Sequence, residues 1–240
     1  MIRRFVEGTL AVLALIALSP VLCIAAIGIR LRSPGPILYR ANRAWLKGSR
    51  FTMYKFRTMH TEQTILKSRV TAEKDPRVFP FGSFLRMTKI DELPQLFNIL
   101  KGEMSFVGPR PEDPYFVENF YTPEQFEVLR VLPGLTSPGT LYNYTHGEKS
   151  LDSKDPDASY VKNVLETRIA LDLVYIRQKS LPYDLRLVAR TLWIMLCIMA
   201  GRTGFPGPPE MKKILKRRSA PAPADPLLPV QPLSSRPSLR

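Results

Sequence analysis

The chain has 240 residues, enough for one core of ordinary size with short appendages. Its 35 lysines and arginines against 21 acidic residues give a formal net charge of +14, which favours anionic partners such as phospholipid headgroups, nucleic acid or phosphorylated ligands. The only histidines are His60 and His146, which disfavours a histidine-rich metal site or a Ser-His-Asp triad and leaves chemistry by Asp, Glu, Lys and Arg.

Residues 1–32 form the first predicted unit, an apolar membrane segment. Leu10 to Ile29 is an uncharged run of twenty residues, which as a straight helix would reach about 30 Å and cross a bilayer. Ser19-Pro20 lies in its middle, where proline removes a helical hydrogen bond and a serine hydroxyl can bond the freed carbonyl. Basic residues flank both ends, which favours the cytoplasmic side for both. The pattern favours a re-entrant hairpin broken at Ser19-Pro20; a spanning helix and a cleaved signal peptide are the alternatives.

A Ser-Pro-Gly-Pro turn opens a soluble body predicted over residues 33–204. Residues 37–40 and 50–59 have the pattern of two strands joined by a tight turn. Strand alternation places Lys55 and Arg57 on the same face of the second strand. Two cations pointing the same way suit a phosphate group. A solvated strand face is the alternative interpretation.

An adjacent carboxylate pair, Asp91-Glu92, is the first candidate site. Apolar residues recur at helical spacing over 93–100. Pro94 is tolerable only in a first turn, so the helix is predicted to start near Asp91 and to end at Gly102. Both carboxylates would then lie at the positive end of a helix dipole, which favours the ionised form that a nucleophile or metal ligand requires. A helix-capping role for Asp91 is the alternative.

Three further charged residues are candidates for the same site. Arg110 lies in a rigid Gly-Pro-Arg-Pro turn and presents a guanidinium suited to bidentate phosphate contact. Arg86 lies in the basic turn ahead of the acidic pair. Asp172 falls on a largely apolar face of a helix predicted over 160–178, so it is expected either to pair with a basic group or to act in the site.

The C-terminal part is predicted to contain a surface helix and a tail. Leu185 to Ala200 is strongly apolar but carries Arg186 and Arg190, which is typical of an interfacial helix lying on a membrane; a core helix is the alternative. Residues 205–240 contain nine prolines and a basic cluster. This composition predicts a disordered tail that is attracted to anionic lipid.

Motifs within residues 1–202 resemble those of the bacterial sugar transferase family, the small monotopic polyprenyl-phosphate phosphoglycosyl transferases. They are KFRTM at 55–59, DPR at 75–77, LRMTKIDELPQLFNILKGEMSFVGPRP at 85–111 and PGLT at 133–136. The DELPQ and VGPRP elements at this spacing are highly specific.

Together with the patterns above, the resemblance implies an α+β fold in three parts. These are a re-entrant membrane helix hairpin over 1–32, a small mixed helix/strand catalytic body with interfacial helices over 33–204, and a disordered proline-rich tail over 205–240. The resemblance also implies the bacterial inner (cytoplasmic) membrane as the location, with the catalytic domain on the cytoplasmic face.

The implied activity is transfer of a phosphosugar from a nucleotide sugar, usually a UDP-sugar, to polyprenyl (undecaprenyl) phosphate, with release of UMP. This is the first membrane step in making a surface glycan: exopolysaccharide, O-antigen, capsule or glycoprotein glycan. Family members use Mg²⁺ and a covalent phosphosugar-aspartate. By motif position Asp91 corresponds to the nucleophile and Glu92 to its acidic neighbour, and both are the candidate Mg²⁺ ligands.

The resemblance also assigns supporting positions for phosphate and substrate: Lys55, Arg86, Arg110 and Asp172, which Arg57 joins through the strand alternation described above. Ser19-Pro20 corresponds to the family's break in the re-entrant helix.

The chain departs from the family pattern at several places. Ala41 and Trp45 stand where the family often has Gln and Gly, and Lys-Ile at 89–90 replaces the usual Ser-Leu. Residues 137–142 replace a Gly-Trp-Ala-Gln run, and 177–180 replace Asn-Trp-Ser. These places are where sugar and nucleotide recognition is expected, so the identity of the donor is not carried over.

Two other classes of function compete with the transferase. A non-enzymatic membrane-bound scaffold of a glycan assembly complex would not need the acidic pair with Lys55 and Arg110, and all of these are intact. A nucleic-acid-binding protein fits the charge, but the membrane segment and the lack of a recognition motif argue against it. The expected partners are therefore a UDP-sugar, polyprenyl phosphate and membrane phospholipid, with no nucleic acid; a homodimer is left open.

Overall fold

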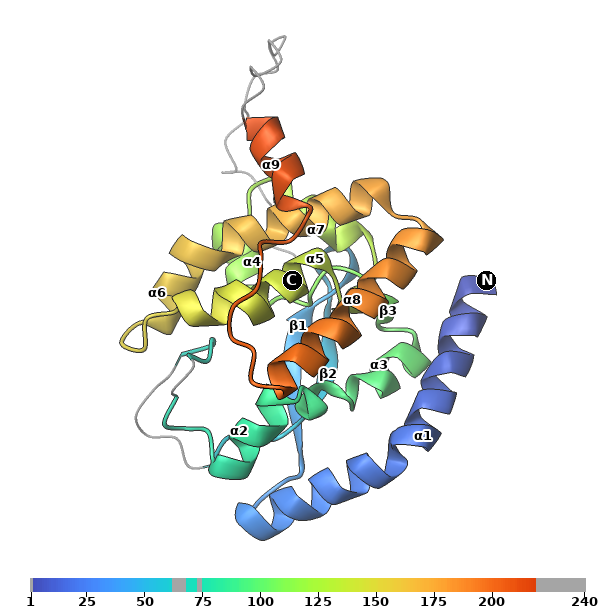
Figure 1. Cartoon of the computed structure of the whole chain (residues 1–240), viewed down its shortest axis with the longest axis vertical. Helices are drawn as coiled ribbons and strands as arrows, with labels where there is room; N and C mark the ends of the chain where they lie inside the picture. Colours follow the sequence, from blue (N-terminus) through green and yellow to red (C-terminus); the bar gives the residue numbers. More distant parts are fainter. Residues whose placement is uncertain (1, 62–67, 73–74, 219–240) are drawn as a thin grey trace, which may run out of the picture.

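The computed structural model describes residues 2–61, 68–72 and 75–218. Helices predominate over four short strands within these residues, so the predicted mixture of helix and strand is confirmed (Figure 1). In chain order the helices and strands are α1 (Ile2–Arg32), β1 (Leu38–Ala44), β2 (Arg50–Phe56), α2 (Pro80–Met87), α3 (Gln95–Lys101), β3 (Ser105–Val107), α4 (Pro114–Phe120), β4 (Gly134–Thr136), α5 (Pro138–Tyr142), α6 (Pro156–Tyr160), α7 (Glu166–Gln178), α8 (Leu181–Met199) and α9 (Met211–Arg218).

The two predicted strands form an antiparallel hairpin. β1 and β2 pair with Leu38 opposite Phe56 at the open end. At the closed end Lys47 has φ 56° and Gly48 has φ 82°, left-handed conformations that let the chain reverse tightly. Lys55 therefore lies one residue from the open end of the hairpin, where the site described below is built.

β3 and β4 form a parallel pair that fixes the Gly-Pro-Arg-Pro turn. The Gly108 amide donates to the Thr136 carbonyl at 3.0 Å, and the Gly134 amide donates to the Pro109 carbonyl at 2.9 Å. A Cβ on Gly108 would lie 2.4 Å from a backbone oxygen, and one on Gly134 would lie 2.1 Å from a backbone nitrogen. Only glycine allows the two segments to approach this closely, and their pairing fixes the backbone just ahead of Arg110.

α1 is one continuous helix that bends. Pro20 lies inside it, and because proline lacks an N–H, the Ile16 carbonyl loses its usual helical partner. The Ser19 hydroxyl donates to that carbonyl at 2.8 Å, as predicted. Figure 1 shows the helix bending about half-way along its length. The predicted break at Ser19-Pro20 is therefore a bend within a single helix, since the serine replaces the hydrogen bond that the proline removes.

Both ends of α1 pack against the body. Near its start Arg3 pairs with Asp184 of α8 at 3.1 Å, and Ser105 of β3 donates a hydrogen bond to Glu7. Near its end Ile29 is fully buried in a cluster with residues of β2 and α2. The helix thus runs along one side of the molecule and contacts it at each end (Figure 1).

Large apolar side chains are exposed on α1 and on one face of α8. Among the described helices, α1 is long and apolar enough to cross a membrane. α8 begins at Leu181, earlier than predicted, and buries Leu187 against the body. Its opposite face exposes the apolar residues Leu181, Leu185, Leu192, Trp193, Leu196 and Met199. An apolar surface of this extent marks contact with a membrane or with another protein.

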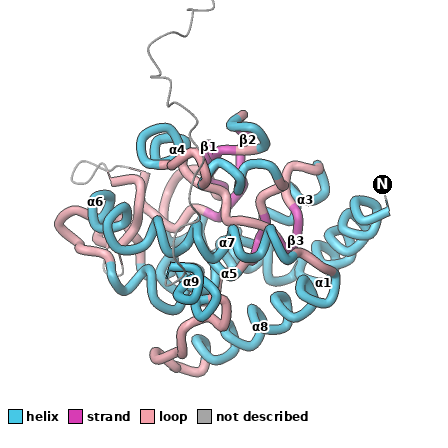
Figure 2. Tube along the Cα trace, turned by 90° about the horizontal axis from the view of Figure 1, so that it is seen from above, coloured by secondary structure: helices cyan, strands magenta, loops and turns pink. Residues whose placement is uncertain are grey.

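The segment predicted as a disordered tail begins with a packed helix. α9 lies against α7 (Figure 2), and its Ile214 is buried in a cluster with Leu171 and Val174 of α7. Just ahead of α9, Glu210 accepts hydrogen bonds from Arg190 at 2.8 and 3.0 Å and from Tyr183 at 2.8 Å. The prediction is wrong for the described part of the tail, because a buried apolar side chain and a paired carboxylate anchor it. Residues 219–240 lie outside the described residues.

Candidate active site

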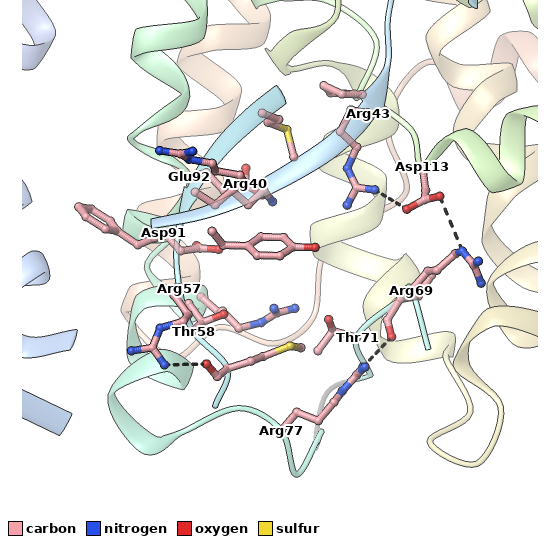
Figure 3. Close-up of a pocket in the computed structure, with 18 of the residues that line it drawn as sticks. Arg40, Arg43, Arg57, Thr58, Arg69, Thr71, Arg77, Asp91, Glu92 and Asp113 are labelled. Carbon is pink, nitrogen blue, oxygen red and sulfur yellow. Dashed lines mark hydrogen bonds and ion pairs between the residues drawn. The ribbon is translucent and has the colours of Figure 1, made fainter. Parts of the chain in front are cut away.

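A cavity of about 1180 Å³ opens between the hairpin, the turn that precedes α3 and the loop that follows β3. Ten cationic and five acidic residues are among those that line its described part. Figure 3 shows Asp91 and Glu92 on one side of this cavity and Arg69 and Arg77 on the opposite side. The excess of cations favours a ligand with several negative charges, such as a diphosphate.

The acidic pair sits in a single 3₁₀ turn, Ile90–Glu92, that leads into α3. α3 itself begins at Gln95, later than predicted, and ends as predicted with Gly102 in a left-handed conformation (φ 89°). Neither the turn nor α3 uses Asp91 as a side-chain cap. The capping alternative for Asp91 is therefore wrong.

Three side chains donate hydrogen bonds to the Glu92 carboxylate. Its Oε1 accepts from Lys55 Nζ at 2.8 Å and from an Arg110 guanidinium nitrogen at 3.0 Å. Its Oε2 accepts from the Tyr144 hydroxyl at 2.6 Å. Charge-assisted hydrogen bonds of this length are the strong ones, so the Glu92 carboxylate is fixed in position and orientation.

Asp91 contrasts with its neighbour. It is also buried, but its Oδ1 has no hydrogen-bond partner among the described residues. An unpartnered buried carboxylate oxygen is costly for folding and is characteristic of a functional group that awaits a ligand. Asp91, rather than Glu92, is therefore the acidic group available to a substrate.

The electrostatics separate the two carboxylates in the same way. Burial raises the pKa of Asp91, and the nearby Glu92 raises it further against the opposing effect of Lys55. Burial alone would also raise the pKa of Glu92, but Arg110 and Lys55 outweigh it and hold that pKa well below its usual range. Burial therefore opposes, at Asp91, the ionisation that the start of a helix was expected to favour.

Tyr144 is a member of the site that the sequence did not reveal. It comes from the turn that follows α5, and its ring lies under Lys89 at 3.9 Å and near Arg110 at 5.6 Å. Burial and the adjacent Glu92 raise the pKa of its hydroxyl well above normal, so it remains a donor. The only sequence signal was its closeness to the 137–142 departure from the family pattern.

Arg86 and Asp172 have different positions relative to the cavity. Arg86 lines it and makes no side-chain hydrogen bond or ion pair within the described chain, so its guanidinium is available to a ligand. Asp172 is buried behind the cavity and accepts from the backbone amides of Gly139 at 3.0 Å and Arg110 at 3.4 Å. Asp172 therefore positions the Arg110 loop and does not contact the cavity.

Arg57 lies at the cavity edge, but its guanidinium is committed elsewhere. It donates to the Pro36 carbonyl at 2.6 Å, to the Ser33 hydroxyl at 2.8 Å and carbonyl at 2.7 Å, and to the Met59 carbonyl at 3.2 Å. Arg57 follows β2, which ends at Phe56, so strand alternation does not govern its direction, and the phosphate contact predicted for it is not supported. Its described role is to fasten the end of α1 to the hairpin.

Replacing Arg57 with lysine is accordingly expected to lower the free energy of unfolding by about 2–3 kcal/mol, because a single ammonium cannot replace four hydrogen bonds from one guanidinium. Urea unfolding in detergent measures this loss. The control is Arg40→Lys, an exposed arginine of the same cavity edge, which should change stability by less than about 0.5 kcal/mol. Equal losses in the two variants would contradict the assignment.

The acidic side chains of the cavity meet the needs of Mg²⁺ in one of the two ways that proteins use. No group of three or more His, Cys, Asp or Glu side chains that could hold a metal occurs among the described residues. Mg²⁺ is, however, commonly bound through one or two carboxylates together with substrate phosphates. Asp91, with its unpartnered oxygen, fits that second arrangement. Glu92, predicted as the second ligand, fits it less well, because Lys55, Arg110 and Tyr144 already occupy both of its oxygens.

Comparison with known proteins places the chain in a family. The family described as bacterial sugar transferase matches residues 1–197. The chain belongs to the bacterial sugar transferase family. The resemblance predicted from KFRTM, DELPQ and VGPRP is thereby confirmed.

Individual members of the bacterial sugar transferase family are similar over most of the chain. A UDP-glucose:undecaprenyl-phosphate glucose-1-phosphate transferase of Escherichia coli (strain K12) is 35% identical over 195 residues, which cover 80% of this chain and 40% of the relative. A protein of the same name from Caulobacter vibrioides is 36% identical over 79% of this chain and 68% of the relative. A UDP-N-acetylgalactosamine-undecaprenyl-phosphate N-acetylgalactosaminephosphotransferase of Aeromonas hydrophila is 36% identical over 85% and 44%. The chain thus spans less than half the length of two of these three relatives.

Proposed function

We propose that this protein transfers a phosphosugar from a UDP-sugar to undecaprenyl phosphate and releases UMP. The observation that carries the proposal is the unpartnered oxygen of Asp91 in a cationic cavity, next to a Glu92 that three side chains hold in place. The names of the relatives support the donor and acceptor classes, since they include a UDP-sugar and undecaprenyl phosphate. A role in surface glycan synthesis follows, and one relative is named as an exopolysaccharide production protein.

The reaction proceeds in two displacements at one phosphorus. An Asp91 carboxylate oxygen attacks the phosphorus that carries the sugar, the bond from that phosphorus to the bridging oxygen breaks, and UMP leaves with the electron pair. A phosphate oxygen of undecaprenyl phosphate then attacks the same phosphorus and returns Asp91 as a free carboxylate. The water-soluble donor and the lipid acceptor need not be bound together, because the phosphosugar waits on the enzyme.

The cations of the cavity prepare the donor for this attack. A carboxylate approaches a diphosphate only when much of the phosphate charge is neutralised. Arg86 is free to contact phosphate, while Lys55 and Arg110 are held beside Asp91 through Glu92. Glu92 thus orients two cations.

Mg²⁺ is the proposed cofactor, with Asp91 as the protein group that would hold it together with the donor diphosphate. Glu92 could join it only by giving up one of its contacts with Lys55, Arg110 and Tyr144. When bound, Mg²⁺ would neutralise phosphate charge at the site. Removal of divalent ions with a chelator is expected to abolish UMP release, and added Mg²⁺ is expected to restore it.

The membrane arrangement follows from α1. We place α1 in the membrane as a re-entrant helix, with the body on the cytoplasmic face of the bacterial inner membrane. The support is that both ends of the helix contact the same body, through Arg3 and Glu7 at one end and Ile29 at the other. A spanning helix would take one of these ends across the bilayer and break its contacts. The exposed apolar face of α8 would rest on the same phospholipid surface.

Tags on the two termini test this topology. Both tags should be inaccessible to an impermeant reagent in intact cells and become labelled after the inner membrane is opened. A second inner-membrane protein that carries the same tag on a known periplasmic terminus supplies the positive control. Labelling of the N-terminal tag in intact cells would show that α1 spans the membrane.

The activity is tested by UMP release from purified full-length protein in lipid nanodiscs. UDP-glucose and UDP-N-acetylgalactosamine are offered with undecaprenyl phosphate and Mg²⁺. Release of UMP and formation of a lipid-linked diphosphosugar are the expected results. If neither donor gives a product with lipid acceptor present, the non-enzymatic scaffold becomes the better account.

A further inference from the structure

One wall of the cavity, beside Asp91, carries an unusual set of polar side chains. Glu148 Oε1 accepts from Lys89 Nζ at 3.2 Å and from Asn143 Nδ2 at 3.3 Å. All three side chains line the same cavity as Asp91. They come from two separate places in the chain, the turn before α3 and the segment after α5, and we refer to Lys89, Asn143 and Glu148 as the Glu148 wall.

The Glu148 wall is tied closely to the acidic pair. Lys89 precedes Asp91 by two residues in the same turn and takes a left-handed conformation (φ 56°) that glycine usually supplies. Its ammonium packs on the ring of Tyr144 at 3.9 Å, and the hydroxyl of that ring bonds Glu92. The wall therefore occupies a fixed position relative to Asp91, set by a shared turn and a shared tyrosine.

The Glu148 carboxylate keeps capacity for a ligand. Its side chain is 35% exposed, and its Oε2 accepts no hydrogen bond from the described residues. A carboxylate, an amide and an ammonium together offer both acceptors and donors to neighbouring hydroxyl groups. Lys89 also lowers the pKa of both Asp91 and Glu92, whereas the proposed attack by Asp91 assigns no step to Glu148 or Asn143.

We propose that Glu148, supported by Asn143 and Lys89, contacts the transferred sugar and selects a neutral sugar over one that carries a carboxylate. This inference rests on the proposed function, because the phosphorus that Asp91 attacks is bonded directly to the sugar. The sugar must therefore lie within one phosphate group of Asp91, where the Glu148 wall stands. Its hydroxyls donate to Glu148 Oε2, which accepts no hydrogen bond from the described residues. The carboxylate of a uronic acid would meet a like charge at that oxygen, because Lys89 and Asn143 are engaged at Oε1.

The test compares donors in wild-type protein and in Glu148→Gln, a substitution that keeps the shape and removes the charge. UMP release is measured with UDP-glucose, UDP-N-acetylgalactosamine and UDP-glucuronate. The wild-type kcat/KM should favour the neutral donors by at least about 100-fold, and the variant should lose about 10- to 100-fold on the better neutral donor. In Glu148→Gln the ratio of kcat/KM for the better neutral donor to kcat/KM for UDP-glucuronate should fall by about 10-fold or more.

Two further measurements separate sugar contact from general damage. UMP lacks the sugar, so its inhibition constant should be the same in wild type and Glu148→Gln. The control variant is Glu118→Gln, an exposed glutamate paired with Arg50 outside the cavity, which should keep the wild-type donor preference.

Each outcome decides the inference. The proposed sugar contact is overturned if wild-type protein uses UDP-glucuronate as well as the neutral donors. It is also overturned if Glu148→Gln keeps the wild-type donor preference. A third contrary result is that Glu148→Gln weakens inhibition by UMP as much as it lowers kcat/KM for the donors. If wild-type protein releases UMP from none of the three donors, the proposed function has failed and the inference falls with it. Wild-type turnover with an unaltered preference in Glu148→Gln leaves the function standing and refutes only the sugar contact.

Discussion

Asp91→Asn is expected to reduce UMP release and lipid-linked product by more than about 10³-fold, because an amide cannot form the phosphosugar ester. The burial that raises the pKa of Asp91 makes its carboxylate more basic than an exposed one, and no partner among the described residues blocks its Oδ1. Both features suit a nucleophile, and the variant loses the basic carboxylate while the position of the side chain is kept. UMP release from wild type and variant at equal protein concentration measures the effect.

Asp91→Asn should fold normally, so a loss of UMP release in this variant can be assigned to the chemistry of Asp91 rather than to unfolding. Since Asp91 Oδ1 has no hydrogen-bond partner within the described residues, an amide in its place breaks no contact at that atom. Its unfolding midpoint should remain within a few degrees of wild type. Glu92→Gln provides the contrast, because it weakens the contacts to Lys55, Arg110 and Tyr144 and should lose stability as well as activity. Substantial turnover by a well-folded Asp91→Asn, checked by mass for deamidation, would refute the nucleophile assignment.

Arg168→Met is expected to have the largest effect on stability, a loss of about 3–5 kcal/mol in the free energy of unfolding. Arg168 is 2% exposed and pairs with the buried Glu112, which also accepts from the Tyr160 hydroxyl at 2.7 Å. Removal of the arginine leaves a carboxylate in the core without its counter-ion. The pair joins α7 to the loop after Arg110, so urea unfolding should shift to lower denaturant.

A double variant tests the cause of that loss. Arg168→Met combined with Glu112→Gln removes the uncompensated charge, and it should be more stable than Arg168→Met alone by about 1–3 kcal/mol. Arg177→Met, which removes partly exposed pairs with Glu124 and Glu127, should cost less than about 1 kcal/mol. Purely additive losses in the double variant would show that packing, rather than the buried charge, accounts for the effect.

The local predictions from the sequence held where short-range chemistry decides the structure. Serine ahead of proline was enough to predict the hydrogen bond from Ser19 to Ile16, because both groups lie on one helical turn. Strand alternation predicted the hairpin and the face of Lys55, and Gly102 marked the end of α3. Each of these features depends on residues only a few positions apart.

The distinction between Asp91 and Glu92 could not be predicted in this way. Both were expected at the start of one helix with similar ionisation. The structure separates them through Lys55, Arg110 and Tyr144, which come from three distant segments. Local sequence carries no information about which of two adjacent carboxylates those segments will reach.

Long-range contacts account for the other differences. Arg57 was predicted to face a phosphate beside Lys55, but it lies just past the end of β2, and its partners in the loop after α1 depend on how that helix returns to the body. The proline-rich composition of the tail concealed the buried apolar side chain of Ile214 and the paired carboxylate of Glu210. Amino-acid composition describes a whole segment on average, whereas one or two specific contacts can hold that segment against the body.

The most direct test of the central claim is a single-turnover experiment without the lipid acceptor. Full-length protein in nanodiscs free of undecaprenyl phosphate is mixed with a UDP-sugar and Mg²⁺, and both UMP and the intact protein mass are measured. A phosphosugar on Asp91 predicts a burst of about one equivalent of UMP per active protein, with a matching mass gain of one sugar phosphate that maps to Asp91. Release of UMP only after the lipid acceptor is added, with no mass gain at any time, would contradict a covalent intermediate and with it the role assigned to Asp91.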